Sequence, residues 1–337
     1  MMNNTTARCR APVSYRLSSD DLELRQVMPL NIADGFFTAG CDPAVFFDKC
    51  AQHQAVRRLA PDLAFDGRQV ASLDRLPPDD GRAWVVRPAL SPSSRGSAVL
   101  LGGQWATASQ VAALLDDAPG PFQIHVHEPG YPVFINGVLD AGEFHVTDAW
   151  RCHTLDLEGR RLLTAVNSLP SAVLPARLVP QLAALANGLG MLHGPLHAEV
   201  VITSTGARLV KLSPRLASTP LPQLCRLGGW PAQEDCWKQW PQALGQGPTQ
   251  GAAVADYSFV ITRAGRVKAF LFDREVRSLE SFSHYFVAPP VGKAVAMTTD
   301  GTTYGCTVFL RNHCLEKLTE EIAMLQSLNL TDAFEID

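Results

Sequence analysis

The residues with the clearest potential for chemistry lie between His193 and Arg215, in the stretch HGPLHAEVVITSTGARLVKLSPR. Its pattern predicts two strands joined by a turn, with Glu199 on the first strand and Lys211 on the second. A carboxylate such as Glu199 suits a hard cation like Mg²⁺, which needs several oxygen ligands. Lys211 stands where the pattern suggests a second acid, so the role of this lysine is the first question that the sequence raises.

The register of this hairpin decides what Lys211 contacts. With a three-residue turn over 204–206, Thr203 faces Ala207 and Glu199 lies opposite Lys211. Opposite charges on facing strands attract each other, so one hypothesis is a structural ion pair in place of a metal site. The other hypothesis is that the ammonium group replaces the charge of a metal beside bound phosphate. We favour the ion pair, because it needs no special geometry.

Two histidines form a second candidate site. His125 and His127 are separated by one residue, and alternation along a strand places both imidazoles on one face. Such a pair holds zinc if a third ligand arrives, for which His193, His197 or Glu199 are the candidates. The spacing matches no known zinc pattern, so we favour separate core or surface histidines.

Composition restricts the functional classes. The chain has 337 residues, of which 46% are hydrophobic and 18% charged, the balance of a globular protein. A formal net charge of −4 gives no basic face for nucleic acid or an anionic membrane. The first residues carry no apolar signal region, and no run is long enough to span a bilayer. These features predict a cytoplasmic protein that binds neither nucleic acid nor membranes.

The cysteines and tryptophans predict packing rather than chemistry. Eight scattered cysteines include no CxxC pair, which is typical of free thiols in a reducing compartment. Cys50, Cys225 and Cys236 have no obvious activating partner, so a nucleophile is not expected. The three tryptophans within 230–240 are expected to pack a lid.

Strands and helices alternate along the rest of the chain. The first 40 or so residues have weak periodicity and predict an irregular lead-in. Residues 42–61 have helical spacing that ends at Pro61, and Thr107 or Ser109 caps another helix. Further helices are predicted over 178–191 and 314–328, and hairpins over 131–152, 193–213 and 256–273, the last turning at 263–265. This order predicts an α+β (mixed α/β) fold of antiparallel sheets with flanking helices.

Four stretches carry a resemblance to a known superfamily: FFDK (46–49), VVRPALSPSSRGSAVL (85–100), EPGYPVFINGVLDAG (128–142) and LGMLHGPLHAEVVITSTGARLVKLSPR (189–215). Together they resemble the ATP-grasp superfamily, and within it the amino-acid and carboxylate–amine ligases. Those enzymes activate a carboxylate as an acyl phosphate and pass it to an amine. The resemblance covers residues 40–240 by motif and the tail more loosely. It implies a reduced N-terminal segment over 1–42, a two-lobed region over 43–240 and a small lid-like domain over 241–337.

The resemblance also implies roles for individual residues. Lys49 and Arg87 would meet the ATP phosphates, Glu199 would bind metal, and Arg215 would contact the substrate carboxylate or acyl phosphate. The loop that would cover the phosphates contributes Ser93, Ser94, Gly96 and Ser97. From the residues alone, Arg87 is equally a solvated rim arginine, and the loop is equally a plain surface turn.

Four departures from the family pattern limit the expected activity. Lys211 replaces the second metal carboxylate, and Ser213 replaces the asparagine after it. The acids expected near adenine and ribose are His125 and Pro132. The sequence therefore predicts that ATP and magnesium are bound weakly or not at all. The predicted role is a non-catalytic binding or regulatory partner, and the alternative is an active carboxylate–amine ligase.

The resemblance also implies partners. The ligand would be a small anionic or amino-acid-like molecule, met by Arg215. The protein partner would be an active ligase paralogue or a second copy of the chain.

Overall fold

The computed structural model describes the chain except for residues 1–14, 91–96, 103–106, 116, 158–159 and 241–250. Its helices are α1 (Asp21–Ala33), α2 (Lys49–Leu59), α3 (Ala108–Leu114), α4 (Leu178–Gly188), α5 (Leu221–Gly228), α6 (Gln233–Lys238), α7 (Asp273–Arg277) and α8 (Leu315–Asn329). Its strands are β1 (Gly67–Val70), β2 (Trp84–Pro88), β3 (Ala98–Leu100), β4 (Phe122–Val126), β5 (Gly130–Asp140), β6 (Glu143–Leu157), β7 (Arg160–Ser168), β8 (His193–Thr203), β9 (Gly206–Ser213), β10 (Ala253–Phe259), β11 (Gly265–Phe270), β12 (Phe282–Val287), β13 (Ala294–Val295), β14 (Cys306–Asn312) and β15 (Phe334–Ile336).

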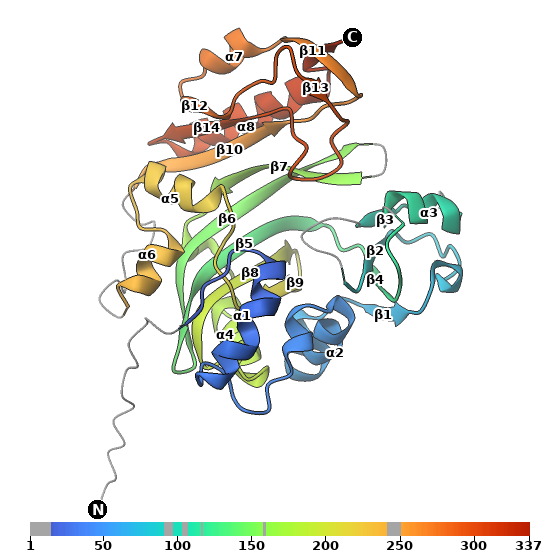
Figure 1. The fold of residues 1–337 in the computed structure, drawn as a ribbon, viewed down its shortest axis with the longest axis vertical. Coiled ribbons are helices and arrows are strands. Elements are labelled where there is room, and N and C mark those ends of the chain that lie inside the picture. The colour runs from blue at the N-terminus through green and yellow to red at the C-terminus, as the bar shows by residue number, and fades with distance from the viewer. Residues whose placement is uncertain (1–14, 91–96, 103–106, 116, 158–159, 241–250) are drawn as a thin grey trace, which may run out of the picture.

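The strands pair in an antiparallel manner throughout the described residues, which confirms the predicted fold class. One large sheet has the order β1-β4-β2-β3-β7-β6-β5-β8-β9, and β10, β14 and β12 continue it beside β7. Among the described residues, the strand pairing that joins β1–β4 to the rest of this sheet is the short β3–β7 contact. In Figure 1 this part projects to the right, and the C-terminal layer lies at the top.

Helices pack on the sheet and bury its apolar side chains. The largest core lies between β5, β8 and β9 and the helices α1, α2 and α4. The C-terminal core packs α8 against β10 and β14. Figure 1 shows α1, α2 and α4 together in the lower part of the molecule. No helix of the described residues is long and apolar enough to cross a bilayer.

The predicted irregular lead-in is wrong, because residues 21–33 form α1. Asp20 caps this helix by accepting hydrogen bonds from the backbone N–H groups of Leu22 and Glu23. Leu24 and Met28 lie on one face and are fully buried in the main core. The helix contains Pro29, which lacks an N–H and weakens the helical signal in the sequence.

Two other predicted elements need correction. The helix expected from residue 42 is split into a 3₁₀ turn over Pro43–Phe46 and α2, which begins after Asp48 caps its first turn. The hairpin expected over 256–273 does not form, because β10 pairs with β7 and β14 whereas β11 pairs with β13 and β15. In contrast, the hairpins over 131–152 and 193–213 and the Thr107 cap of α3 are confirmed.

Candidate functional site

The β8–β9 hairpin has the expected facing pair but reaches it by a different geometry. Thr203 pairs with Gly206, so the turn is one residue shorter than predicted. A bulge after Leu209 then inserts Val210 as an extra residue. The two deviations cancel, and Glu199 lies opposite Lys211 as predicted.

The salt bridge of Lys211 nevertheless goes elsewhere. Its ammonium group contacts the Asp21 carboxylate at the start of α1, and both side chains are 10% exposed. The second oxygen of Asp21 accepts a hydrogen bond from Arg215 Nε at 3.2 Å. The predicted Glu199–Lys211 ion pair is therefore wrong in its partner, because the N-terminal segment supplies a nearer carboxylate.

Arg215 is held by the same N-terminal segment. Its Nη1 donates to the backbone oxygens of Leu216 at 2.9 Å and Ser19 at 3.4 Å. The Tyr15 hydroxyl donates to Pro214 O at 2.8 Å, so residues 15–21 run beside the end of β9. The guanidinium group of Arg215 is thus buried and already binds a carboxylate of its own chain.

Glu199 ends a buried chain of polar side chains. Asp148 accepts a hydrogen bond from the Asn136 amide nitrogen, so the Asn136 oxygen is left to accept from His197 Nδ1 at 2.6 Å. This fixes the His197 tautomer and leaves its Nε2 facing Glu199 Oε1 at 3.5 Å. Burial lowers the pKa of His197 to about 4.

The charge of Glu199 is maintained by its neighbours. Burial opposes its ionisation, but the neighbouring His197 and the positive charges of Lys211 and Arg215 outweigh burial and lower the pKa of Glu199 to about 2. Glu199 is therefore a carboxylate at neutral pH. Its attraction to Lys211 persists although the ammonium group contacts Asp21.

Arg87 joins two parts of the sheet. Its Nε donates to the Gln123 side-chain oxygen at 2.9 Å, and its Nη1 donates to Val210 O at 3.2 Å. Val210 is the bulge residue of β9, so the guanidinium group links β4 to β9. Burial lowers the pKa of Arg87 to about 10. The interpretation as a solvated rim arginine is wrong, whereas a contact with phosphate stays a prediction.

Lys49 lies in the same electrostatic environment. Its Nζ donates to Pro88 O at 3.4 Å. Burial, and then the positive charges of Arg87 and Lys211, lower the pKa of Lys49 to about 7, while Glu199 and Asp21 act in the opposite direction. The structure thus brings the predicted residues Lys49, Arg87, Glu199 and Arg215 into one charged cluster, to which it adds Lys211 and Asp21.

The donors in this cluster do not fit magnesium. A protonated lysine has no lone pair and repels a cation, and Lys211 occupies the position of the second acid. Ser213 Oγ is buried without a hydrogen-bond partner. It could offer a metal only one neutral oxygen ligand. No group of three or more His, Cys, Asp or Glu that could hold a metal occurs among the described residues.

The predicted phosphate-covering loop is only partly described. Ser93, Ser94 and Gly96 lie outside the described residues. Ser97 is half-buried immediately before β3. The role of this loop stays a prediction.

The two predicted zinc histidines have separate neighbours. His125 is buried and stacks on Phe65 with ring centroids 4.0 Å apart, and burial lowers its pKa to about 3. His127 Nε2 accepts from Arg161 Nη1 at 2.9 Å. Pro132 faces Val201 in the β5–β8 pairing. Neither proline nor histidine has a carboxylate, so these two positions lack the acids expected near ribose and adenine.

The tryptophans are packing residues as predicted, but they lie in the main core and in the core beside α5 rather than in a lid. The cysteines are packed as predicted. The ring centroids of Trp237 and Tyr15 lie 5.6 Å apart in an edge-to-face contact, and those of Trp230 and Trp150 lie 6.4 Å apart. Trp240 Nε1 donates a hydrogen bond to an Asp140 carboxylate oxygen at 2.9 Å. The three cysteines that the sequence singled out are buried, and burial raises the pKa of each thiol: Cys50 to about 12, Cys236 to about 11, and Cys225 further still.

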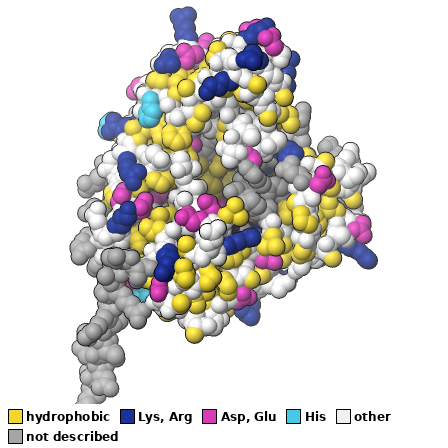
Figure 2. All heavy atoms as spheres, in the orientation of Figure 1, with side chains coloured by type: hydrophobic (Ala, Val, Ile, Leu, Met, Phe, Trp, Pro, Cys, Tyr) yellow, Lys and Arg dark blue, Asp and Glu magenta, His cyan; other side chains and the backbone are white. Residues whose placement is uncertain are grey.

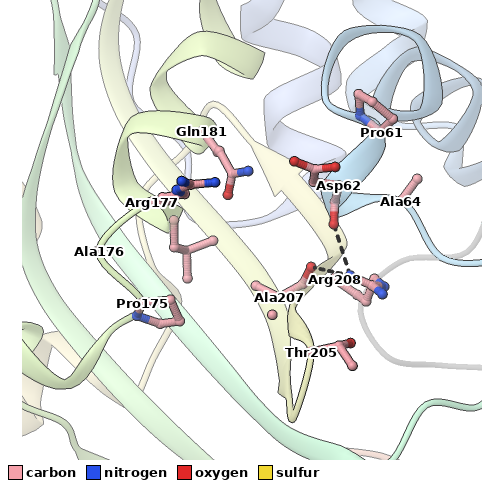
Figure 3. Close-up of a pocket in the computed structure, with 12 residues that line it drawn as sticks. Pro61, Asp62, Ala64, Pro175, Ala176, Arg177, Gln181, Thr205, Ala207 and Arg208 are labelled. Atoms are coloured by element: carbon pink, nitrogen blue, oxygen red, sulfur yellow. Dashed lines mark hydrogen bonds between the residues drawn. The ribbon is translucent and has the colours of Figure 1, made fainter.

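A hollow and a separate pocket mark the surface. Figure 2 shows a hollow below the C-terminal layer, and acidic side chains gather at its lower rim where α1 begins in Figure 1. Figure 3 shows a pocket of about 540 Å³ between the start of α4, the β8–β9 turn and residues 61–64. Its lining includes Arg177, Gln181 and Arg208 and none of the charged cluster.

Sequence reasoning missed Asp21, Asn136 and Asp148. The run SSDDLE at 18–23 carries the signal of a helix start. Nothing local connects Asp21 to Lys211, because 190 positions separate them. Asn136 and Asp148 face each other across the β5–β6 hairpin, and their pairing follows only from its register.

Comparisons with known proteins agree at the level of the fold. No family model matches the sequence, and no curated protein matches it significantly. Among solved structures, an L-amino acid ligase from Bacillus licheniformis is similar with a TM-score of 0.65 at 12% identity, over 87% of this chain and 72% of that chain. Phosphoribosylglycinamide synthetase from Anaerococcus prevotii gives a TM-score of 0.55 at 10% identity, over 94% and 80%.

A third similar structure contains a nucleotide. N5-carboxyaminoimidazole synthase from Aspergillus clavatus, solved with ADP and an aminoimidazole ribonucleotide, gives a TM-score of 0.56 at 9% identity, over 85% of this chain and 74% of that one. At these identities the likeness establishes architecture only. The chain therefore has the ATP-grasp fold, resembling that of the carboxylate–amine ligases.

Proposed function

We propose that this protein uses the ATP-grasp fold for binding rather than for magnesium–ATP ligation. The observation that carries the proposal is the Asp21 carboxylate held between Lys211 and Arg215. An ammonium group replaces a metal ligand, and the guanidinium group that would meet the substrate is already paired. The pairing supports a cleft that recognises carboxylates without a metal.

The proposal extends to ligand and partner. The ligand is a small anionic or amino-acid-like molecule, because Lys211 and Arg215 present donors for a carboxylate. The protein acts in the cytoplasm as a regulatory partner, paired with an active ligase paralogue or with a second copy of the chain. Its net charge of −4 supports a function without nucleic acid or membranes.

Turnover tests the proposal. The purified protein, incubated with Mg²⁺, ATP and a mixture of amino acids, is expected to release no ADP or phosphate above a protein-free control. Thermal unfolding with and without Mg–ATP is the second readout, because a ligand of the native state raises the melting temperature. Magnesium-dependent ADP release that saturates with an amino acid would overturn the proposal.

That outcome would favour the alternative, an active carboxylate–amine ligase. Lys49, Glu199 and Arg215 lie in one cluster as such an enzyme requires, and this observation supports the alternative. An active enzyme would have to displace Asp21 and bind metal through Glu199 and groups outside the present donor set. The turnover assay separates the two functions directly.

A further inference from the structure

The Asp21 carboxylate has the contacts of a bound ligand. One oxygen contacts the Lys211 ammonium group, and the other accepts from Arg215 Nε at 3.2 Å. Two cationic donors on the two oxygens of one carboxylate are the arrangement by which proteins recognise carboxylate ligands. The carboxylate comes from another part of the chain, 190 positions away from Lys211.

Asp21 lies at the first residue of α1, before the residues that anchor this helix in the core. Leu22 beside it is 62% exposed, whereas Leu24 and Met28, which are fully buried, anchor the rest of α1. The first turn, held by the Asp20 cap, is thus the outer end of a well-anchored helix. Helix ends fray more readily than helix interiors. Figure 2 shows acidic side chains at the rim of the hollow where this turn lies in Figure 1.

Charge favours replacement of Asp21 by another anion. The cluster contains the cations Arg87, Lys211 and Arg215, and Lys49, whose pKa of about 7 leaves it partly protonated at neutral pH, against the carboxylates Asp21 and Glu199. Without the Asp21 carboxylate, Lys211 and Arg215 would be nearly buried charges with Glu199 as the nearest acid. Unpaired buried charges are strongly unfavourable, so the vacated position would attract an external carboxylate.

We propose that Asp21 is an internal ligand of this site and that an external small carboxylate binds by displacing it from Lys211 and Arg215. This inference rests on the proposed function and deepens it, because it states what regulates access to the cleft. Binding by the wild-type protein is then weakened by competition from Asp21. Any partner that draws the first turn of α1 away would increase the affinity.

The test measures binding of succinate, a probe dicarboxylate, by calorimetry to the full chain and to three variants. Asp21→Asn removes the competing charge and is expected to bind succinate at least ~10-fold more tightly than wild type, a gain of about 1.4 kcal/mol. Asp21→Glu keeps the charge and is expected to show no such gain. Asp20→Asn removes the same charge one residue earlier while keeping a good N-cap, and it should match wild type.

Unfolding measurements keep the test valid if Asp21→Asn is unstable. Succinate should then raise the melting temperature of this variant more than that of wild type, because a ligand stabilises the state that binds it. Equal succinate binding by Asp21→Asn and wild type overturns the inference and leaves the proposed function standing. Binding by neither protein overturns both. A gain with inorganic phosphate but not with succinate overturns the assignment to a carboxylate.

Discussion

Asp21 and Lys211 form a salt bridge across 190 positions of the chain, although Glu199 is the residue that faces Lys211 in the hairpin register. The N-terminal helix thereby supplies the counter-charge of the candidate site. The pair is nearly buried, at 10% exposure for each side chain. Removing one partner from such a pair commonly costs about 3–5 kcal/mol, because the other charge is left unpaired.

A double-mutant cycle on Asp21→Asn and Lys211→Met is expected to show a coupling free energy of about 1–3 kcal/mol in chemical denaturation. The corresponding cycle on Glu199→Gln and Lys211→Met should give a smaller coupling. The exposed pair Arg16–Asp34, at 45% and 37% exposure, serves as a control and should give at most about 1 kcal/mol. A larger coupling free energy for Glu199–Lys211 than for Asp21–Lys211 would contradict this prediction, because it would show that Lys211 interacts mainly with the residue that faces it.

Arg87 is expected to matter for stability, because it connects Gln123 on β4 to the bulge residue Val210 on β9. Arg87→Lys keeps the charge but cannot reach both acceptors with one ammonium group. The free energy of unfolding should fall by about 1–3 kcal/mol. Arg68→Lys on the exposed side of β1 is the matched control. If both lysine variants are as stable as wild type, Arg87 does not connect the two parts of the sheet.

Asp256 should give the protein a distinct pH dependence. Burial raises the pKa of this carboxyl group to about 7 despite a hydrogen bond from Val166 N–H at 2.8 Å. Because the folded pKa lies above the unfolded value of 3.8, stability from this group is complete below about pH 4 and is lost as pH rises through about 7. Asp256→Asn should remove this loss, a change on the order of 4 kcal/mol across the window.

The measurement is urea denaturation of wild type and Asp256→Asn from pH 4 to pH 8. The difference in unfolding free energy between them should move in favour of the variant as pH rises. Glu320→Gln, at a side chain with 72% exposure, should show no such trend. A constant difference between Asp256→Asn and wild type would mean that Asp256 is already ionised in the folded protein.

Restoring acidic metal ligands should create a response to magnesium. Lys211→Glu with Ser213→Asn places a second carboxylate and an amide oxygen beside Glu199, the donors that Mg²⁺ prefers. Asp21 then faces two carboxylates, so the variant should be less stable than wild type without metal. Added MgCl₂ should raise its melting temperature but not that of wild type.

Lys317→Glu, at a side chain of α8 that is 40% exposed, reproduces the charge change of this variant away from the site. It should show the small, nonspecific salt response of wild type. A wild-type protein that Mg²⁺ stabilises as much as it stabilises the restored variant would show that the native donors already hold metal.

The sequence was most informative where local chemistry decides structure. Alternation within 193–213 predicted the hairpin and its facing charges, and a Thr–x–x–Gln cap predicted the start of α3. The bulge at Val210 was not predictable, because its cause is a carbonyl that meets Arg87 from a distant strand. Similarly, the RAG sequence predicted a turn, but tertiary pairing sends β10 and β11 to different sheets.

The sequence predicted four residues of the site, but it did not predict which side chains contact each other. Lys49, Arg87, Glu199 and Arg215 do lie in one cluster, although three of them are far apart in sequence. The missing member was Asp21, because Pro29 obscured the helix that presents it. A charge pair between the ends of two remote elements leaves no periodic signal in either.

We propose that Asp21 satisfies the charges of Lys211 and Arg215 within the chain, so that magnesium–ATP is not needed to neutralise them. Calorimetric titration of the wild-type protein with ATP, at saturating Mg²⁺ and again with a chelator, tests this claim most directly. We expect no binding, or a Kd weaker than about 1 mM that Mg²⁺ does not change. A low-micromolar Kd that is lost when Mg²⁺ is removed would contradict the account.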